Sequence, residues 1–283
     1  MAKKKGIAAS TGFTVFQYCI LIFIAIICLF PFVVMLINCT RSSNSIMSSA
    51  ISFIPGSDLM TNYKVFEGKT FNPWVGFMNS IIISVGSTAC TIYFSTMTAY
   101  SIVAFDWKAK KAFFTLIMCV LMIPGQVTAI GFYQFMYKIG LVNSYIPLII
   151  PAIAAPSTVF YMRQYMIPSL PMDILQSARI DGAGEFRIFN QIALPLMKPA
   201  MATQAIFAFV ASWNALFIPS ILLVDKDKYT MPIMVSQLAG DSYKVEFGAV
   251  YLGLVMTVLP LFVVYFLLSK YIIAGVALGG VKE

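Results

Sequence analysis

The chain carries the stretch Gln176-Ser177-Ala178-Arg179-Ile180-Asp181-Gly182 and, after nine further residues, continues Ile192-Ala193-Leu194-Pro195. This is the longest polar interruption in the second half of an otherwise apolar chain. Because long apolar segments flank it on both sides, the stretch is predicted to be a surface element between two membrane spans.

The first half of this stretch predicts a short helix. Pro171 and Asp173 are typical of a helix start, because proline fits the first turn and the helix dipole favours an acidic side chain there. The four-residue repeat of Leu170, Ile174 and Ala178 predicts one apolar face.

A turn and a second short helix are predicted to follow. Gly182 suits the left-handed conformation that commonly ends a helix. A second helical run begins at Glu185 and ends at Pro195, and its apolar face consists of Phe189, Ile192 and Ala193. From these residues alone the hairpin is either an amphipathic element without a partner or a docking site for another subunit.

Composition indicates a membrane protein. Of 283 residues, 60% are hydrophobic and 11% are charged, whereas a soluble domain carries about 25% charged residues. The net charge of +8 is spread over short connecting segments, which favours membrane topology over nucleic-acid binding. The chain has no histidine, the commonest general base and metal ligand, so neither a catalytic nor a metal site is predicted.

The cysteines form no C-x-x-C pair and lie in apolar segments, so they are predicted to be small buried hydrophobic side chains. They are Cys19, Cys28, Cys39, Cys90 and Cys119.

Six segments are long and apolar enough to cross a hydrocarbon core of about 30 Å. They cover residues 15–37, 76–104, 112–137, 144–162, 199–224 and 247–269. The predicted fold is an all-α membrane protein with six transmembrane helices. The third span is expected to break at Pro124-Gly125, and the prolines of the fourth span are expected to bend it.

The second span is rich in small and polar side chains. Close helix packing and direct contact with a transported solute are both open interpretations of this pattern. The residues are Asn79, Ser80, Ser84, Ser87, Thr88, Thr91, Ser95, Thr96 and Thr98.

The distribution of basic residues predicts the orientation. Six spans place both termini on one side, and that side holds 12 of the 19 Lys and Arg residues. The positive-inside rule therefore puts the termini and the opening stretch in the cytoplasm. These 12 are Lys3, Lys4, Lys5, Lys108, Lys110, Lys111, Arg163, Arg179, Arg187, Lys198, Lys270 and Lys282.

Domain limits follow from this topology. The prediction is a cytoplasmic N-terminus, a first transmembrane helix, an extracellular loop, a five-helix core that includes the cytoplasmic loop 163–198, and a cytoplasmic tail. The corresponding ranges are 1–14, 15–37, 38–75, 76–269 and 270–283.

The six predicted spans contain no Asp, Glu, Lys or Arg. Proton-coupled carriers need ionisable residues within the bilayer, so active transport by this chain would take its energy from another subunit. The chain itself supplies no nucleotide site, because Tyr63 replaces the first glycine of the partial phosphate-loop match that ends in Gly68-Lys69-Thr70.

The opening stretch resembles the E-A-A-x-x-x-G-x9-I-x-L-P loop of ABC importer permeases. Gln176 and Ser177 stand where the family has Glu and the first Ala, and the second Ala, Asp-Gly, Ile, Leu and Pro match at Ala178, Asp181, Gly182, Ile192, Leu194 and Pro195. Gln176 removes a charge that the family pattern has at this position.

Further resemblance extends over nearly the whole chain. The six spans, Leu141-Val142-Asn143-Ser144, Trp213-Asn214 and the ending Gly279-Gly280-Val281-Lys282 are similar to the second permease of maltose-type carbohydrate importers. The resemblance implies a type I ABC importer transmembrane fold with a cytoplasmic coupling helix-turn-helix, in a bacterial cell membrane. It also implies a second permease subunit, two cytoplasmic ATPase subunits that bind ATP and magnesium, and an extracellular sugar-binding protein.

The family also implies roles for individual residues. The ATPase-docking residues are expected to be Gln176, Ser177, Ala178, Arg179, Asp181, Gly182, Ile192, Leu194 and Pro195. Trp213 and Asn214 offer an aromatic face and an amide, which suit either a sugar path or interhelical packing. The loop 225–246 either faces the binding protein or is a connector.

Two other functions remain open from the sequence. One is an ABC permease for a solute other than a sugar, and the other is a self-contained facilitator or sodium-coupled carrier. The docking loop and the absence of an internal repeat argue against the second. An enzyme is not predicted, since the ATPase activity would reside in a partner subunit.

Overall fold

The computed structural model describes residues 11–68, 72–241 and 244–280, and within these ranges the regular structure is entirely helical. Three stretches used in the sequence predictions lie outside the described residues. They are Lys3 to Lys5, Lys69-Thr70 and Val281-Lys282.

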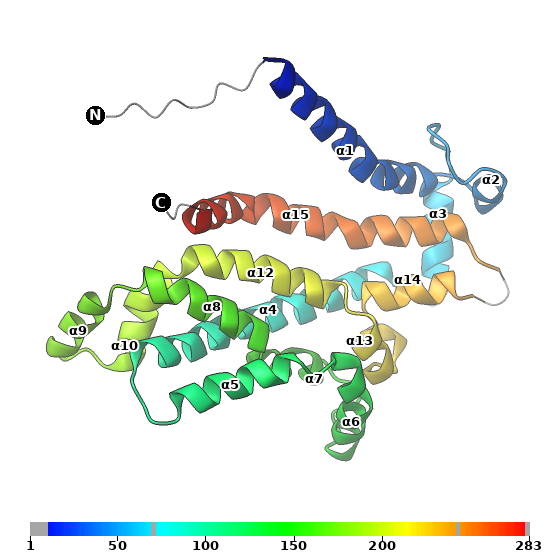
Figure 1. Cartoon of the computed structure of the whole chain (residues 1–283). Coiled ribbons are helices and arrows are strands. Elements are labelled where there is room, and N and C mark those ends of the chain that lie inside the picture. Colours follow the sequence, from blue (N-terminus) through cyan, green and yellow to red (C-terminus); the bar gives the residue numbers. More distant parts are fainter. Residues whose placement is uncertain (1–10, 69–71, 242–243, 281–283) are drawn as a thin grey trace. The chain divides into compact units, whose positions relative to one another are not determined.

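The elements are named in chain order, and η marks short 3-10 or π segments (Figure 1). They are α1 (Thr11–Asn38), α2 (Ser43–Ser48), α3 (Leu59–Gly68), α4 (Pro73–Ala104), α5 (Lys110–Leu121), α6 (Gly125–Lys138), α7 (Ile146–Ile149), η1 (Ile150–Ile153), α8 (Pro156–Ser169), α9 (Met172–Ile180), α10 (Glu185–Ile188), η2 (Phe189–Ala193), α11 (Leu194–Leu196), α12 (Lys198–Trp213), α13 (Phe217–Leu222), η3 (Lys226–Lys228), α14 (Met231–Ala239) and α15 (Phe247–Gly280).

The chain divides into two compact units, one of Met1–Lys69 with Leu238–Val255 and one of Thr70–Gln237 with Met256–Glu283. In the first unit, Arg41 organises the turn after α1. Its guanidinium donates to Asn38 Oδ1 at 2.8 Å and to the carbonyl oxygens of Ser45 and Ser49 at 2.9 and 2.8 Å. The side-chain amide of Asn62 in α3 donates to the carbonyl oxygen of Arg41 at 3.0 Å. The predicted extracellular loop 38–75 is therefore a folded segment with two helices and the start of α4.

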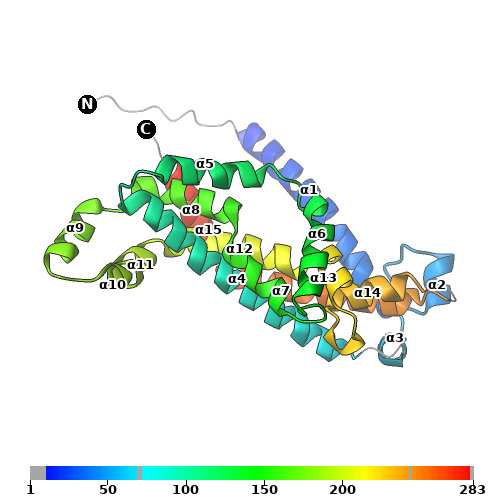
Figure 2. The same ribbon diagram turned by 90° about the horizontal axis from the view of Figure 1, so that it is seen from below.

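The second unit is built around α4. This helix packs against α8 and α12, and both views show the three helices side by side (Figures 1 and 2). Its small and hydroxyl-bearing side chains permit this close packing. The helices α9 and α10 project beyond one end of this group (Figure 2).

Within the described residues, four helical segments are long and apolar enough to cross a membrane by themselves, and two bent helix pairs bring the number to as many as six. The pair α5 and α6 bends by 98° between Leu121 and Gly125, at the predicted Pro124-Gly125 break. The second pair joins Glu185–Leu196 to α12 and bends by 81° before Lys198. The upper number equals the six predicted spans, although in the second pair only α12 lies in a predicted span, because Glu185–Leu196 belongs to the loop 163–198.

Several limits differ from the sequence prediction. The fifth predicted span, residues 199–224, is interrupted because α12 ends at Trp213 and α13 begins at Phe217. Predicted loops also contain helices, namely α14 within 225–246 and the end of α8, which continues to Ser169. The helix α15 runs on to Gly280, through most of the predicted tail 270–283.

The prediction that all cysteines are buried is wrong. Cys39 is buried, but Cys19 and Cys28 on α1 and Cys119 on α5 are exposed, and all five cysteine thiols are free. The physical reason is that α1 and α5 expose apolar side chains, as helices do when they face lipid or another subunit.

Asn143 joins two connections of the second unit. It has a positive φ of 61°, and its Oδ1 accepts the backbone N–H groups of Val224 and Asp225, each at 3.1 Å. Its own carbonyl oxygen accepts from Lys228 Nζ at 2.8 Å. The short Leu141 to Ser144 segment is thus fixed to the chain that follows α13.

Candidate functional site

The loop between α8 and α12 folds as predicted into two short helical runs joined at Gly182. The first run, α9, begins at Met172 after Pro171, with Asp173 in its first turn. The buried residue of α9 is Leu175, whereas Ile174 is half exposed. Of the predicted apolar face, Leu170 is buried and Ala178 packs against the same hydrophobic cluster, but Ile174 does not. Because the helix begins only at Met172, Leu175 and Ala178 share its inward side, and Leu175 takes the place predicted for Ile174.

The turn after α9 has the hydrogen bonds of a Schellman motif. The Ala183 N–H donates to the Ala178 carbonyl oxygen and the Gly182 N–H to the Arg179 carbonyl oxygen, both at 3.0 Å. Gly182 has φ of +80°, a conformation that costs little only for glycine. A Cβ at Gly182 would meet no atom within 4 Å, so backbone conformation, and not crowding, requires glycine here.

An ion pair closes this turn. Arg179 Nε lies 2.6 Å from Glu185 Oε1, which joins the last turn of α9 to the first residue of α10. The hydrogen bond from Arg179 lowers the pKa of the Glu185 carboxyl group, with a smaller contribution in the same direction from the Tyr100 hydroxyl. Both charged side chains are only partly exposed, so the pair is screened less than one on an open surface.

The same pair connects the hairpin to the end of α4. The Tyr100 hydroxyl donates to Glu185 Oε2 at 3.0 Å, and the Arg179 guanidinium lies 5.1 Å from the Phe105 ring centroid. An Arg179 Nη2 hydrogen bond of 3.4 Å also reaches the carbonyl oxygen of Ala104, the last residue of α4. These contacts join the hairpin directly to the end of α4.

The second run, α10 with η2 and α11, is anchored by aromatic packing. Ile188, Phe189 and Ala193 are buried, and the Phe189 ring packs against Tyr93 and Tyr100 with centroids 5.7 and 5.4 Å apart. The predicted apolar face of Phe189, Ile192 and Ala193 is confirmed, with Ile192 partly buried. The run continues one residue beyond Pro195, to Leu196.

The expected docking residues fall into two groups. Gln176, Ser177, Asp181, Gly182 and Pro195 are exposed, whereas Ala178, Arg179, Ile192 and Leu194 are partly buried. Sequence reasoning missed the exposed apolar side chains Ile180 and Phe186, which are 87% and 70% exposed. Ile180 ends the first helix and Phe186 lies at the start of the second, and neither belongs to a predicted apolar face. An apolar side chain at such a position could have indicated exposed apolar surface.

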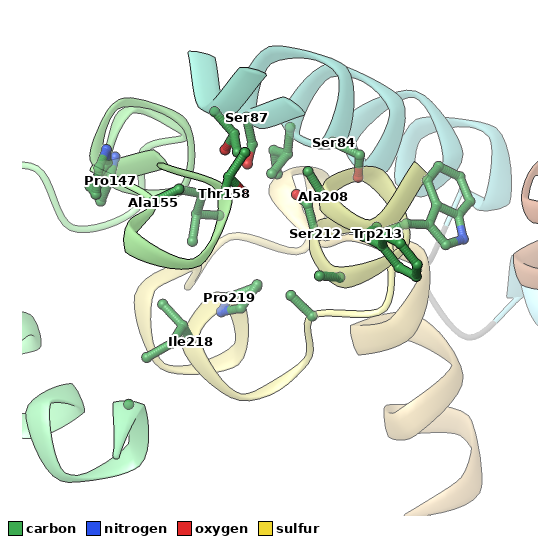
Figure 3. A pocket seen from close by; sticks show the side chains of 18 of the residues that line it. Ser84, Ser87, Pro147, Ala155, Thr158, Ala208, Ser212, Trp213, Ile218 and Pro219 are labelled. Atoms are coloured by element: carbon green, nitrogen blue, oxygen red, sulfur yellow. The ribbon is translucent and has the colours of Figure 1, made fainter. Parts of the chain in front are cut away.

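A cavity of about 800 Å³ lies among α4, α6, α8, α12 and α13 (Figure 3). Its polar lining consists of hydroxyl groups and one amide, and none of the described residues that line it is Asp, Glu, Lys or Arg. Ser84 and Ser87 approach it from α4, Thr158 from α8 and Ser212 from α12 (Figure 3). Such a lining suits an uncharged polar solute, because hydroxyl and amide groups donate and accept hydrogen bonds without supplying a net charge.

The α4 hydroxyls in this lining have a helical spacing. Ser80, Ser84, Ser87 and Thr91 share one face of α4. Two of these hydroxyl groups already make a hydrogen bond. Ser80 Oγ accepts from the Met231 N–H at 2.9 Å, and Thr91 Oγ1 donates to the Ala152 carbonyl oxygen at 3.1 Å. By contrast, Ser84 is 1% exposed, and its Oγ has no hydrogen-bond partner within the described chain. Thr230 Oγ1, which also lines the cavity, is in the same situation.

The Trp213 ring is built into the packing of α12. Trp213 is 1% exposed, its Nε1 donates to the Thr257 carbonyl oxygen of α15 at 2.8 Å, and its ring stacks on Phe209 with centroids 5.7 Å apart. Trp213 also borders the cavity (Figure 3), whereas Asn214, exposed at the end of α12, is not among the lining residues. Of the two residues that the sequence predicted as a possible sugar path, only Trp213 therefore borders the cavity.

Within the described ranges no group of three or more His, Cys, Asp or Glu side chains is placed to hold a metal ion.

Comparison with known proteins gives a family and a fold. Residues 91–277 match the family described as "binding-protein-dependent transport system inner membrane component". The chain is 36% identical over 265 residues to the arabinooligosaccharides transport system permease protein AraQ of Halalkalibacterium halodurans, covering 92% of this chain and 93% of AraQ. It is 32% identical over 266 residues to the lactose transport system permease protein LacG of Rhizobium radiobacter, covering 94% and 95%.

A solved structure has the same fold. It is the crystal structure of a bacterial ABC transporter involved in the import of the acidic polysaccharide alginate. One of its chains superposes with a TM-score of 0.78 at 21% sequence identity, covering 92% of this chain and 96% of that one.

Proposed function

The chain belongs to the family of binding-protein-dependent transport system inner membrane components, and we propose that it is a permease subunit of an ATP-driven sugar importer. The observation that carries this proposal is the hairpin of α9 and α10, which is tied through Arg179 and Glu185 to the end of α4. The relatives named for arabino-oligosaccharides and lactose match nearly the whole chain, which supports sugar as the substrate class.

We assign α9 as the coupling helix that docks into a cleft of a cytoplasmic ATPase subunit. Gln176, Ser177 and Asp181 supply exposed polar groups, and Ile180 and Phe186 supply exposed apolar surface. An interface with an apolar centre and a polar rim has this composition. Gln176 retains hydrogen-bonding capacity without the carboxylate of the family pattern, so the docking proposed here depends on shape and hydrogen bonds at that position.

The coupling follows from how the hairpin is attached. ATP-driven closure of two ATPase subunits pulls α9, and the ion pair and the packing of Phe189 pass this displacement to α4. ATP hydrolysis then resets the helices. ATP and magnesium are bound by the ATPase subunits and not by this chain.

The proposed topology keeps both termini and the hairpin in the cytoplasm, with residues 38–75 and 225–246 outside. The excess of basic residues on the hairpin side supports this orientation. The outer segments are the ones we assign to contact an extracellular sugar-binding protein. A second permease subunit completes the translocation path, since the helices of this chain leave much apolar surface uncovered.

The cavity next to Ser84 supports an uncharged sugar as the solute. A transported carboxylate or phosphate would need a cation or a cluster of N–H donors in this low-dielectric space. We propose that hydroxyl groups of α4, α8 and α12 line the path. In this proposal Trp213 positions α12 against α15 and has no direct role in solute binding.

The test is reconstitution of the complete complex in proteoliposomes with a panel of solutes on the cognate binding protein. We expect ATP-dependent uptake of a neutral oligosaccharide, and a tagged chain should co-purify the ATPase subunit. The variant Ala178→Asp, which places an unpaired carboxylate in the hairpin packing, should lose both co-purification and uptake, while the exposed control Asp173→Asn keeps them. Uptake in the absence of an ATPase subunit would contradict the proposal, as would uptake of acidic sugars only.

A further inference from the structure

A second cavity, of about 840 Å³, lies where α4 ends and α5 begins. It belongs to the same compact unit as the hairpin but shares none of the hairpin's residues. Its lining residues are Ile102, Asp106, Trp107, Lys108, Lys110, Lys111, Phe114, Thr115 and Arg163. Four of the described lining side chains are cationic and one is acidic, so the cavity has a strong positive excess.

Two of these cations are held in place by the protein. Lys110 Nζ donates to the Phe105 carbonyl oxygen at 3.0 Å. The Arg163 guanidinium lies 4.2 Å from the Phe114 ring centroid, and its Nη1 donates to Gln164 Oε1 at 3.3 Å. Arg163 Nε is buried without a hydrogen-bond partner in the part of the chain that the structure describes. A buried donor of this kind is normally satisfied by a ligand or water.

The position of the cavity matches the depth of lipid headgroups. The apolar helix α4 ends at Ala104 and the apolar helix α5 begins at Lys110, so the turn between them lies where the hydrocarbon core gives way to water. Trp107 is partly exposed at this turn, as interfacial tryptophans are. The remaining lining offers apolar surface at the partly exposed Phe114, next to the cations.

We propose that this cavity binds an anionic phospholipid, with Lys108, Lys111 and Arg163 neutralising the headgroup phosphate and with Phe114 against the upper acyl chains. Basic pockets between membrane helices bind such headgroups because the low dielectric strengthens each charge contact. The proposal requires only that the chain lies in a membrane, and does not depend on the transport function.

The test uses the full-length chain in phosphatidylcholine nanodiscs that contain increasing fractions of phosphatidylglycerol with brominated acyl chains. Bromine quenches nearby tryptophans, and the difference between wild type and Trp107→Phe isolates the quenching of Trp107. We expect half-maximal quenching at a low fraction of phosphatidylglycerol. The double variant Lys108→Gln/Lys111→Gln should raise that fraction by about fivefold for each charge removed.

Three controls make the outcome decisive. The double variant Lys64→Gln/Lys138→Gln removes two exposed lysines elsewhere and should leave the titration unchanged. Brominated phosphatidylcholine should quench Trp107 only in proportion to its fraction, and equal saturable quenching by it would overturn the proposal. Soluble glycerol phosphate and inorganic phosphate are added as competitors. Displacement of the lipid by either at low concentration would mean a free-phosphate site, and an unchanged titration in Lys108→Gln/Lys111→Gln would mean that no headgroup site exists.

Discussion

The hairpin of α9 and α10 and the cavity beside α4 use the same membrane helix in different ways. The hairpin is a local structure, in which neighbouring residues form the turn and the pair Arg179 and Glu185 closes it. The cavity is assembled from segments far apart in the chain, and two of its hydroxyl groups, those of Ser84 and Thr230, have no partner among the described residues. In the function proposed above, this difference separates two roles: the hairpin, held by its own contacts, transmits force, and the cavity leaves polar groups free for a solute.

The largest expected effect is on the hairpin turn. Gly182→Val forces a β-branched residue into φ of +80°, at a cost of about 1 to 3 kcal/mol that the isolated turn cannot absorb. Uptake by the reconstituted complex should fall by about fivefold to 150-fold, because 1.4 kcal/mol corresponds to a factor of ten. Gly182→Asn is the matched control, since asparagine tolerates this conformation, and it should retain most of the uptake. Equal loss of uptake in both variants would mean that the absence of a side chain at position 182 is required, and that the backbone conformation of Gly182 is not the cause.

An intermediate effect is expected in the cavity. Ser84→Ala and Thr230→Val remove hydroxyl groups that have no partner in the described part of the chain, so thermal unfolding should hardly change. Loss of a hydrogen bond to the solute, about 1 kcal/mol, should weaken solute binding about fivefold. Binding of a labelled oligosaccharide to the complex locked with a non-hydrolysable ATP analogue measures this directly.

The control for the cavity variants is Thr98→Val on the same helix, where the hydroxyl already donates to the Phe94 carbonyl oxygen at 2.8 Å. Weaker binding in this variant as well would mean that any hydroxyl loss disturbs α4. If Ser84→Ala and Thr230→Val bind normally but uncouple ATP hydrolysis from uptake, the separation of roles between cavity and hairpin is wrong.

The smallest expected effect is the pH dependence of the stability that the Arg179–Glu185 pair gives to the hairpin. The hydrogen bond from Arg179 lowers the pKa of Glu185 in the folded chain, so the ionised carboxylate stabilises the fold. This contribution is fully present above the pKa of an unfolded glutamate, about 4.3, and is lost as the pH falls through the lower folded value. The difference in melting temperature between wild type and Glu185→Gln should therefore be largest near neutral pH and shrink in acid. A difference that grows in acid would contradict the assigned direction.

Local features of the hairpin were predictable from sequence. The start of α9 near Pro171, the left-handed turn at Gly182 and the buried face of Phe189 and Ala193 all agree with the structure. Each depends on backbone geometry or helical periodicity over a few residues. The same reasoning wrongly placed Ile174 on the buried face of α9, where Leu175 lies, because Leu170 precedes the helix and does not set its repeat.

The contacts that join the hairpin to α4 could not be predicted in this way. Glu185 meets Tyr100, 85 residues earlier, and Arg179 meets the carbonyl oxygen of Ala104, 75 residues earlier. The break after Trp213 was missed as well, since an apolar composition continues across it and Asn214 alone is a weak signal.

The sequence by itself determined that the chain is helical, that it lies in a membrane and that a short helical hairpin interrupts its apolar segments. These follow from apolar length, charge distribution and the preferences of glycine and proline, all of which act over short distances. The tertiary structure decided that Arg179 faces inward to α4, that Trp213 is a packing residue, and that Ser84 and Thr230 border one cavity. These features depend on which helices pack together. Packing is set by shape complementarity between segments that are far apart in the sequence, and no local sequence pattern predicts which segments will meet.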